Sequence, residues 1–290
     1  MLVKPHQLFA DALTADYAIG AFNASHMEVV QGIMAAAEEL KSPVIVQTSE
    51  GAIEYAGLNM ISDIIKRAAL DSSVPAVMHL DHGHSLDMVK KCIEVGYTSV
   101  MIDMSKKDFA DNMRETKEVV DYAHERGVWV EAELGAIIGK EGMKDLHGAM
   151  TPDAFLTDPA QVVEFTKTTG VDALAVSVGT IHGAFSGQEY IRFELLEKIK
   201  EMVPHLPLVL HGASGIANEH LRKACTMHVC KVNVDTELRQ NFVAAVKAYF
   251  DTKHESVDTR DILGPAREAI KQKVAEKIAV FGSNNMAKVY

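Results

Sequence analysis

Eight short apolar runs, separated by longer amphipathic stretches, are the feature that most constrains the fold of this chain. The amphipathic stretches carry helical periodicity, as in Val29, Ile33 and Leu40. Strands that alternate with helices in this way run parallel, and eight such units predict a closed (β/α)8 barrel. The predicted strands cover residues 17–23, 43–48, 75–80, 98–103, 128–134, 172–178, 207–212 and 229–234.

An open, doubly wound sheet is the alternative to a barrel. That fold usually carries a G-x-G-x-x-G turn after its first strand, where the glycines let the backbone approach a dinucleotide. The corresponding turn here reads FNASHME, at residues 22–28. The sequence therefore favours the barrel.

The spacing of the strands adds two features to the barrel. The fifth and sixth strands are separated by an unusually long connection, and residues 135–155 form the excess, which we interpret as a candidate lid over the active face. Residues 263–282 predict one further helix, begun by Pro265 and lying outside the barrel or on a partner subunit. With 290 residues, we expect a single domain over residues 1–290.

Composition excludes several classes of protein. The formal net charge of −11 repels phosphate backbones, so we expect no nucleic-acid partner. The chain has no signal-peptide pattern and no apolar stretch near the roughly 18 residues that span a membrane, so we expect a cytoplasmic protein with no membrane partner. The three cysteines lack metal-site or disulfide spacing and are predicted to be buried thiols.

Polar side chains gather where the predicted strands end, which in a barrel is the active face. Three histidines there, His82, His182 and His211, come from different strands, and each is followed by glycine. Three neutral imidazoles around an open position are a common way to hold catalytic Zn²⁺. Any one of them could instead be a hydrogen-bonded histidine at the barrel rim, but the set of three favours a metal. The other polar residues at this face include Asn23, Ser49, Asp81, Glu131, Glu133, Asn233 and Asp235.

Glycine and hydroxyl residues mark a second feature of the same face. They lie where strands turn into helices, in GTIHGAFSG (179–187), HGASGIAN (211–218) and VNVDTE (232–237). Backbone N–H groups at such turns bind phosphate well. We predict a phosphate site beside the metal. His79, two residues before Asp81, is expected to support the site rather than to bind the metal.

The order of these motifs resembles one known family. VMHLDHG, SVMID, VEAELG, GTIHG, LVLHGASGI, KVNVDTEL and LGPAREAI resemble, over essentially the whole chain, the class II (zinc-dependent) fructose- and tagatose-bisphosphate aldolases. That family consists of (β/α)8 barrels that cleave ketose phosphates to dihydroxyacetone phosphate and an aldehyde. The resemblance implies the same reaction here, carried out by a homo-oligomer that is either a dimer or a tetramer.

The resemblance also implies a role for individual residues. His82, His182 and His211 match the zinc ligands, and Glu133 matches a carboxylate close to the zinc. Asp81 matches the acid/base beside the metal, which takes the proton of the aldol hydroxyl, and Glu141 matches the mobile-loop base, which protonates the enediolate carbon. The residues that match the dihydroxyacetone phosphate site are Gly183, Gly212, Ser214, Asn233, Asp235 and Thr236. A monovalent cation, Na⁺ or K⁺, is implied near this phosphate.

Departures from the family lie at the distal end of the substrate. Met104 replaces a small residue after the fourth strand and is expected to shrink the distal pocket, while Lys106 and Lys107 add charge. Ser49 and Arg260 match positions that meet the distal phosphate, and Arg260 is expected to come from a neighbouring subunit. An aldolase for a ketose 1-phosphate with a non-phosphate anionic group is therefore the alternative to a bisphosphate aldolase.

Two other functions fit the sequence less well than an aldolase does. A zinc hydrolase on the same barrel often has an H-x-H pair on its first strand, whereas the first strand here ends in Asn23. A non-catalytic sugar-phosphate-binding or assembly subunit would have no need for a complete set of metal ligands. Both are therefore disfavoured.

Overall fold

The computed structural model describes residues 1–135, 138–139, 155–182, 191–252 and 257–289, with only the backbone of 138–139 and 181–182. Eight parallel strands close a barrel in the order β1-β2-β3-β4-β5-β7-β9-β10, and β10 pairs with β1. All eight predicted strands are confirmed, with ends that shift by one or a few residues. Their bounds are β1 Ile19–Asn23, β2 Val44–Ser49, β3 Ala76–Gly83, β4 Ser99–Ile102, β5 Trp129–Leu134, β7 Ala173–Val176, β9 Leu208–Leu210 and β10 Val229–Val234.

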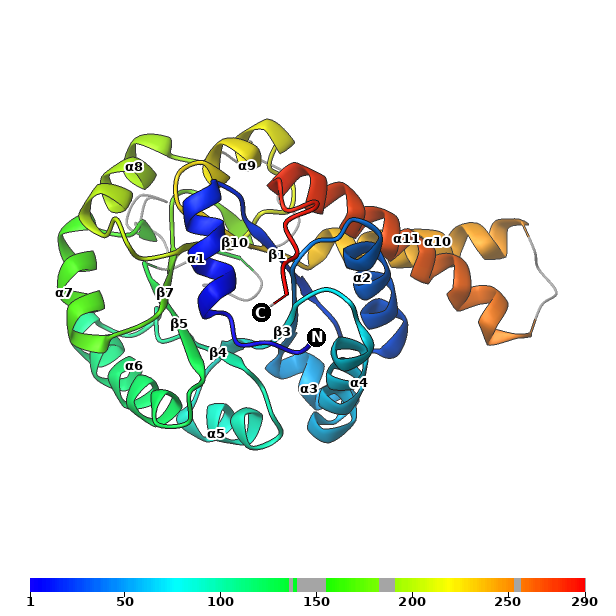
Figure 1. Cartoon of the computed structure of the whole chain (residues 1–290), viewed down its shortest axis with the longest axis horizontal. Coiled ribbons are helices and arrows are strands. Elements are labelled where there is room, and N and C mark those ends of the chain that lie inside the picture. Colours follow the sequence, from blue (N-terminus) through cyan, green and yellow to red (C-terminus); the bar gives the residue numbers. More distant parts are fainter. Residues whose placement is uncertain (136–137, 140–154, 183–190, 253–256, 290) are drawn as a thin grey trace, which may run out of the picture.

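Helices surround this barrel (Figure 1). Several begin at a side chain that caps the first turn: Ser85, Asp108 and Asp158 each accept a hydrogen bond from a backbone N–H two or three residues later. The helices are α1 His6–Ala15, α2 Met27–Glu39, α3 Glu50–Ala56, α4 Leu58–Asp71, α5 Leu86–Glu94, α6 Phe109–His124, α7 Pro159–Thr169, α8 Phe193–Met202, α9 Asn218–Cys225, α10 Thr236–Thr252 and α11 Thr259–Phe281.

Two apolar clusters form the core. The larger one fills the layer between the outer surface of the barrel and the helices. The smaller one lies inside the barrel and includes Leu8 and Phe9 of α1. The Phe9 ring packs against the ring of Trp129, with centroids 4.1 Å apart and the two planes tilted by 39°. Helix α1 thus closes the end of the barrel at which the strands begin (Figure 1). The polar ends of the strands are left at the opposite end.

A second, very small sheet lies outside the barrel. Strand β6 (Ile138–Gly139) pairs in parallel with β8 (Ile181–His182), so the backbone of Gly139 lies beside that of His182. This pairing is not among the strands predicted from the sequence. Most of the candidate lid at 135–155 lies outside the described residues.

The C-terminal helix differs from its prediction at one end. Helix α11 begins at Thr259 and contains Pro265, which was expected to start it. The reason is Asp258, whose carboxylate accepts a hydrogen bond from the backbone N–H of Arg260 and caps the helix upstream of the proline. Helix α11 packs against α2 and α10, outside the barrel, and its N-terminal part extends with α10 away from the barrel (Figure 1).

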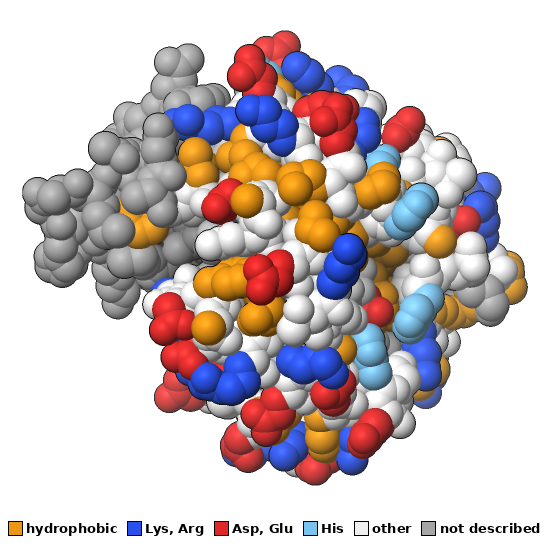
Figure 2. Space-filling model, turned by 90° about the vertical axis from the view of Figure 1, so that its left-hand side faces the viewer, with side chains coloured by type: hydrophobic (Ala, Val, Ile, Leu, Met, Phe, Trp, Pro, Cys, Tyr) orange, Lys and Arg blue, Asp and Glu red, His pale blue; other side chains and the backbone are white. Residues whose placement is uncertain are grey.

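Charged side chains of both signs are mixed on the surface (Figure 2). On the face shown in Figure 2, acidic and basic side chains are intermixed around a central group of apolar ones, so the described part of that face offers no continuous basic surface. Among the described residues, no helix is both long and apolar enough to cross a bilayer. The three cysteines are free and buried.

The contact between α2 and α11 gives a test of the fold. A Cβ atom at Gly32 would lie 2.8 Å from Cγ2 of Ile270 and 2.9 Å from the carbonyl oxygen of Arg267. Gly32→Ala should therefore push α11 away and lower the free energy of unfolding by about 1–3 kcal/mol, measured by urea denaturation at fixed protein concentration. Gly264→Ala, in α11 with no atom within 4 Å of its Cβ position, is the matched control and should stabilise the protein by up to about 1 kcal/mol. Equal changes in the free energy of unfolding for the two variants would mean that α2 and α11 are not tightly packed at Gly32.

Candidate active site

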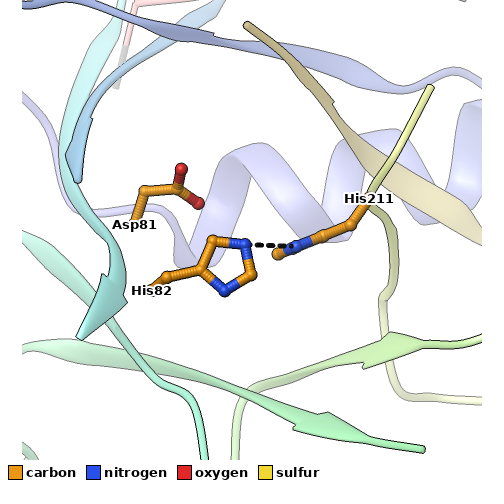
Figure 3. A group of neighbouring side chains, drawn as sticks. All are labelled: Asp81, His82 and His211. Atoms are coloured by element: carbon orange, nitrogen blue, oxygen red, sulfur yellow. Dashed lines mark hydrogen bonds between the residues drawn. The ribbon is translucent and has the colours of Figure 1, made fainter. Parts of the chain in front are cut away.

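The centre of the site begins with an irregularity in β3. Successive strand residues normally face opposite sides of a sheet, yet the side chains of Asp81 and His82 are both buried in one cluster with His211 (Figure 3). The pairing of β3 with β4 shifts between Leu80 and Gly83, and His82 has a left-handed backbone with φ of 47°. This bulge re-aims His82 so that two consecutive functional side chains point to the same place.

Gly83 is required by that bulge. A Cβ atom there would lie 2.6 Å from the carbonyl oxygen of Met101 on β4, and no real side chain tolerates so short a contact. The glycine after His82 therefore permits close approach of a neighbouring strand.

Two histidines meet across the barrel. Nε2 of His82 and Nδ1 of His211 are 3.1 Å apart, and each ring has a carboxylate on its other nitrogen. His82 uses Nδ1 to contact Asp103 Oδ2 at 2.8 Å, and His211 uses Nε2 to contact Glu131 Oε1 at 2.9 Å. Carboxylates in these positions fix the orientation of an imidazole and leave the facing nitrogens for a metal.

The donor set fits a divalent metal. Two nitrogens bound to one tetrahedral zinc at about 2.0–2.1 Å lie roughly 3.3 Å apart, close to the separation of His82 and His211. The ligand atoms of Asp81, His82 and His211 lie within 4.8 Å of one another, as do those of His82, Asp103 and Glu133. Glu133 Oε2 is 3.7 Å from Nδ1 of His211. The structure thus brings four of the predicted residues, Asp81, His82, Glu133 and His211, to one point.

Asp81 is held by two amides. Asn23 donates a hydrogen bond to Oδ2 at 2.7 Å and Asn233 donates one to Oδ1 at 3.0 Å. Asn23 is in turn oriented by Gln47, whose Nε2 donates to its Oδ1 at 2.7 Å. Because both amides offer only donors to the carboxylate, they favour its ionised form.

The protonation states of the metal-free site follow from these contacts. Burial opposes charge on both Asp81 and His82, but mutual attraction overcomes it: His82, Lys231 and His211 help lower the pKa of Asp81 to about 2. Asp81, Asp103 and Glu133 raise the pKa of His82 to about 10. Burial lowers the pKa of His211 below its usual value. At neutral pH, His82 is therefore an imidazolium between carboxylates, and His211 is neutral.

The residues predicted to bind phosphate lie at or shortly before the starts of two helices. Gly212 follows His211 with a left-handed φ of 64°, and Ser214 stands in the turn before α9. Asn233 is on β10, and Thr236 is the first residue of α10. Asp235 pairs with Arg239 at 2.6 Å. These positions put backbone N–H groups near the end of the barrel that holds the histidines.

Some predicted residues cannot be placed. The side chain of His182, and all of Glu141 and Gly183, lie outside the described residues. Ser49 ends β2, and its hydroxyl caps α3 by accepting a hydrogen bond from the N–H of Ala52. Arg260 does not join the site of its own chain. Its side chain is 88% exposed, pairs with Asp258 and belongs to the part of α11 that extends away from the barrel.

The expectation for Met104 is wrong. Its side chain is buried in the apolar layer between barrel and helices, beside Leu86 and Val119, and does not face the histidines. Residues at the end of a strand can turn to either surface of the barrel, and an apolar side chain is stabilised in the apolar layer. Lys107 forms an ion pair with Glu115 on the surface, 2.6 Å away.

Three further side chains lie at this site and have no role predicted from the sequence. Asp103 orients His82, Glu131 orients His211, and Lys231 contacts Glu131 at 2.9 Å. A signal existed, because Glu131 and Glu133, like Lys231 and Asn233, alternate along buried strands and so share a face. Charged residues on the inner face of a barrel need partners there.

Comparison with known proteins identifies the family. The sequence model of "Fructose-bisphosphate aldolase class-II" matches residues 3–286. The chain belongs to this family. It is 41% identical to a fructose-bisphosphate aldolase of Geobacillus stearothermophilus over 291 residues, which cover 99% of each protein. It is 42% identical to one of Thermus caldophilus over 307 residues, covering 98% of this chain and 99% of the relative.

Solved structures agree with this assignment. The crystal structure of the YdjI aldolase from Escherichia coli K12 superposes with a TM-score of 0.88 at 35% identity, covering 99% of this chain and 100% of that one. As a class II family member, the chain is an aldehyde-lyase that uses a divalent metal. The barrel predicted from the sequence and the aldolase family are both confirmed.

The raised pKa of His82 gives a test of the metal centre. Because this ring is protonated below about pH 10 in the metal-free protein, a metal that binds it must displace that proton. Zn²⁺ binding to metal-free protein at pH 7.5 should therefore release about one proton, and the apparent affinity should rise up to about tenfold per pH unit until it levels near pH 10. Calorimetry in two buffers of different ionisation enthalpy measures the release.

Asp103→Asn is the matched variant for this test. It removes one of the charges that raise the pKa of His82, so it should reduce proton release at the same pH. Zinc binding by the wild type with no proton release would contradict the assignment of His82 as a protonated ligand.

Proposed function

We propose that this chain is a zinc-dependent aldolase that reversibly cleaves a ketose 1-phosphate with an anionic distal group to dihydroxyacetone phosphate and an aldehyde. The observation that carries the proposal is the Asp81 carboxylate, held by Asn23 and Asn233 beside the facing nitrogens of His82 and His211. A base with both oxygens oriented, next to a set of metal ligands, is what cleavage of an aldol requires.

His82 and His211, together with His182, are the proposed zinc ligands, and Glu133 is a nearby or alternative ligand. Imidazole nitrogens oriented by carboxylates favour Zn²⁺ over the harder Mg²⁺ and Ca²⁺, which prefer oxygen ligands. When bound, the metal supplies positive charge next to the oxygens that become negative as the carbon–carbon bond breaks.

Asp81 and Glu141 divide the proton transfers in this proposal. Asp81 takes the proton of the aldol hydroxyl, the carbon–carbon bond breaks to release the aldehyde, and the bonding electrons stay with the dihydroxyacetone phosphate half as an enediolate. Glu141 then protonates the enediolate carbon. In the metal-free site the low pKa of Asp81 means that the group is ionised at neutral pH, as a proton acceptor must be.

The phosphate of the dihydroxyacetone half is assigned to the turns after His182 and His211 and to the start of α10. Backbone N–H groups near Gly183, Gly212 and Ser214 and at Asp235–Thr236 would bind it, with Asn233 beside the adjoining hydroxyls. A Na⁺ or K⁺ ion near this phosphate remains part of the proposal.

The distal group is assigned to a recess of about 250 Å³ beside Asn23, Ser49 and Asp235. Its wall is mostly apolar, and its two basic side chains, His26 and Arg239, already pair with Glu28 and Asp235. An anionic group there needs a further cation, and Arg260 of a second copy of the chain is the candidate. We therefore propose a homo-oligomer, a dimer or tetramer of single-domain chains, in which the extended α10–α11 pair reaches a neighbouring barrel.

Fructose and tagatose bisphosphates are the first candidate substrates, because Met104 does not narrow the site. A ketose 1-phosphate with a distal carboxylate is the alternative, since a guanidinium binds carboxylate and phosphate equally well through two hydrogen bonds.

Separate loss of the two proton transfers tests the mechanism. Asp81→Ala should lower the rate of ketose cleavage by roughly 10²–10⁴-fold, the usual contribution of a general base, yet keep the exchange of a dihydroxyacetone phosphate proton with solvent. Glu141→Ala should lose this exchange. Proton NMR in D₂O follows the exchange, and a coupled assay follows cleavage.

Asp87→Ala, at an exposed carboxylate of α5, is the control and should change neither reaction. Equal loss of both reactions in Asp81→Ala and Glu141→Ala would refute the division of roles.

Removal of the Arg260 guanidinium tests the distal site. Arg260→Ala should raise KM for anionic aldehydes by the equivalent of roughly 1.5–3 kcal/mol, typical of a lost charge-assisted hydrogen bond, and leave glycolaldehyde unaffected. Arg67→Ala, at another exposed arginine paired with an aspartate, should change neither the KM for anionic aldehydes nor that for glycolaldehyde. Initial-rate kinetics of condensation with dihydroxyacetone phosphate measure both. Similar losses with neutral and anionic aldehydes would contradict the assignment of Arg260.

A further inference from the structure

An ion pair lies deep inside the barrel, below the proposed metal ligands. Nζ of Lys231 on β10 is 2.9 Å from Oε2 and 3.2 Å from Oε1 of Glu131 on β5. The lysine side chain is 1% exposed and the glutamate side chain is fully buried. Such a pair has to overcome the cost of removing both charges from water, and an apolar pair of similar size is often as stable or more stable. Stability alone therefore does not explain it.

The pair continues directly into the candidate active site. Oε1 of Glu131 is also 2.9 Å from Nε2 of His211, and Nδ1 of His211 faces His82 at 3.1 Å. Lysine, glutamate and histidine thus form one chain of contacts from the middle of the barrel to the proposed ligands. If His211 donates its Nε2–H to Glu131, its Nδ1 lone pair points to the place where the metal is proposed.

Among the described residues, Glu131 is the carboxylate that forms an ion pair with Lys231, and Asp81 is near enough to interact with its charge. Its neighbours across the sheet are Ile19 on β1 and Val209 on β9, both part of the apolar cluster inside the barrel. The other polar group near Glu131 is His79, whose Nε2 is 3.6 Å from Oε2 and whose Nδ1 contacts Ser99 at 2.7 Å. The lysine is therefore directed at Glu131.

We infer that Lys231 is a positioning residue for the metal: it holds the Glu131 carboxylate in the orientation that fixes the tautomer and direction of His211. This inference rests on the proposed role of His211 as a ligand. In this inference Lys231 acts through two other residues, Glu131 and His211. The same chain of contacts gives Glu131 its part, as the carboxylate that orients His211.

Three variants separate positioning from simple charge balance. Lys231→Met leaves a buried carboxylate without its cation, and Glu131→Gln leaves a buried cation without its carboxylate. The double variant Glu131→Gln/Lys231→Met removes both charges and restores neutrality. For each, we would measure the Zn²⁺ dissociation constant of metal-free protein by competition with a chromogenic chelator, and stability without metal by urea denaturation.

Both single variants should be less stable and should bind Zn²⁺ about 10- to 100-fold more weakly, the usual effect of losing an outer partner of a metal ligand. The double variant should regain stability but keep the weaker zinc affinity, because a neutral amide orients His211 less firmly. Recovery of wild-type zinc affinity in the double variant would overturn the inference. The double variant also provides a folded protein if a single variant does not fold.

Lys277→Met is the matched control. Lys277 is also a buried lysine, paired with Glu237 at 2.8 Å, but it lies on α11 outside the barrel. This variant should lose stability and keep wild-type zinc affinity. Failure of the wild type itself to bind Zn²⁺ would overturn the proposed metal site and the inference with it, whereas wild-type affinity in Lys231→Met would overturn the inference alone.

Discussion

The bulge in β3 is the feature on which the site depends. A regular strand would send Asp81 and His82 to opposite surfaces, one into the barrel and one into the apolar layer around it. The left-handed backbone at His82 and the close approach allowed by Gly83 bring both side chains to the same point. The proposed base and a proposed ligand can therefore act on adjacent atoms of one substrate.

Charge compensation supports that arrangement. Three carboxylates at the centre have defined donors: Asp81 has two asparagine amides, Asp103 has His82, and Glu131 has Lys231 and His211. In a buried setting an unpaired charge is costly, and a paired one keeps its orientation. The same contacts that make these charges tolerable also aim the imidazoles at a single place.

The apolar and the polar parts of the barrel interior lie at opposite ends of the barrel axis. Near α1 the interior is apolar, with Phe9 packed on Trp129, and at the other end it is polar. Outside the bulge in β3, side chains alternate along the strands, so a strand contributes both to the outer apolar layer and to one of these inner zones. The extended α10–α11 pair lies outside this division and carries Arg260 away from its own site, so a complete distal pocket is proposed only for an assembly.

The sequence by itself determined the eight strands, the helices between them and the residues at the strand ends, because hydrophobic periodicity and strand length are local properties. It also identified Asp81, His82, Glu133 and His211, which follow or end strands and therefore meet at one end of any parallel barrel. Tertiary structure alone decided which way each side chain turns. Met104 faces the apolar layer, His82 turns inward only through a bulge, and Lys231, Glu131 and Asp103 owe their proposed roles to partners many residues away. Such pairings depend on the register between strands and on the closing of the barrel, which bring together residues that no local pattern connects.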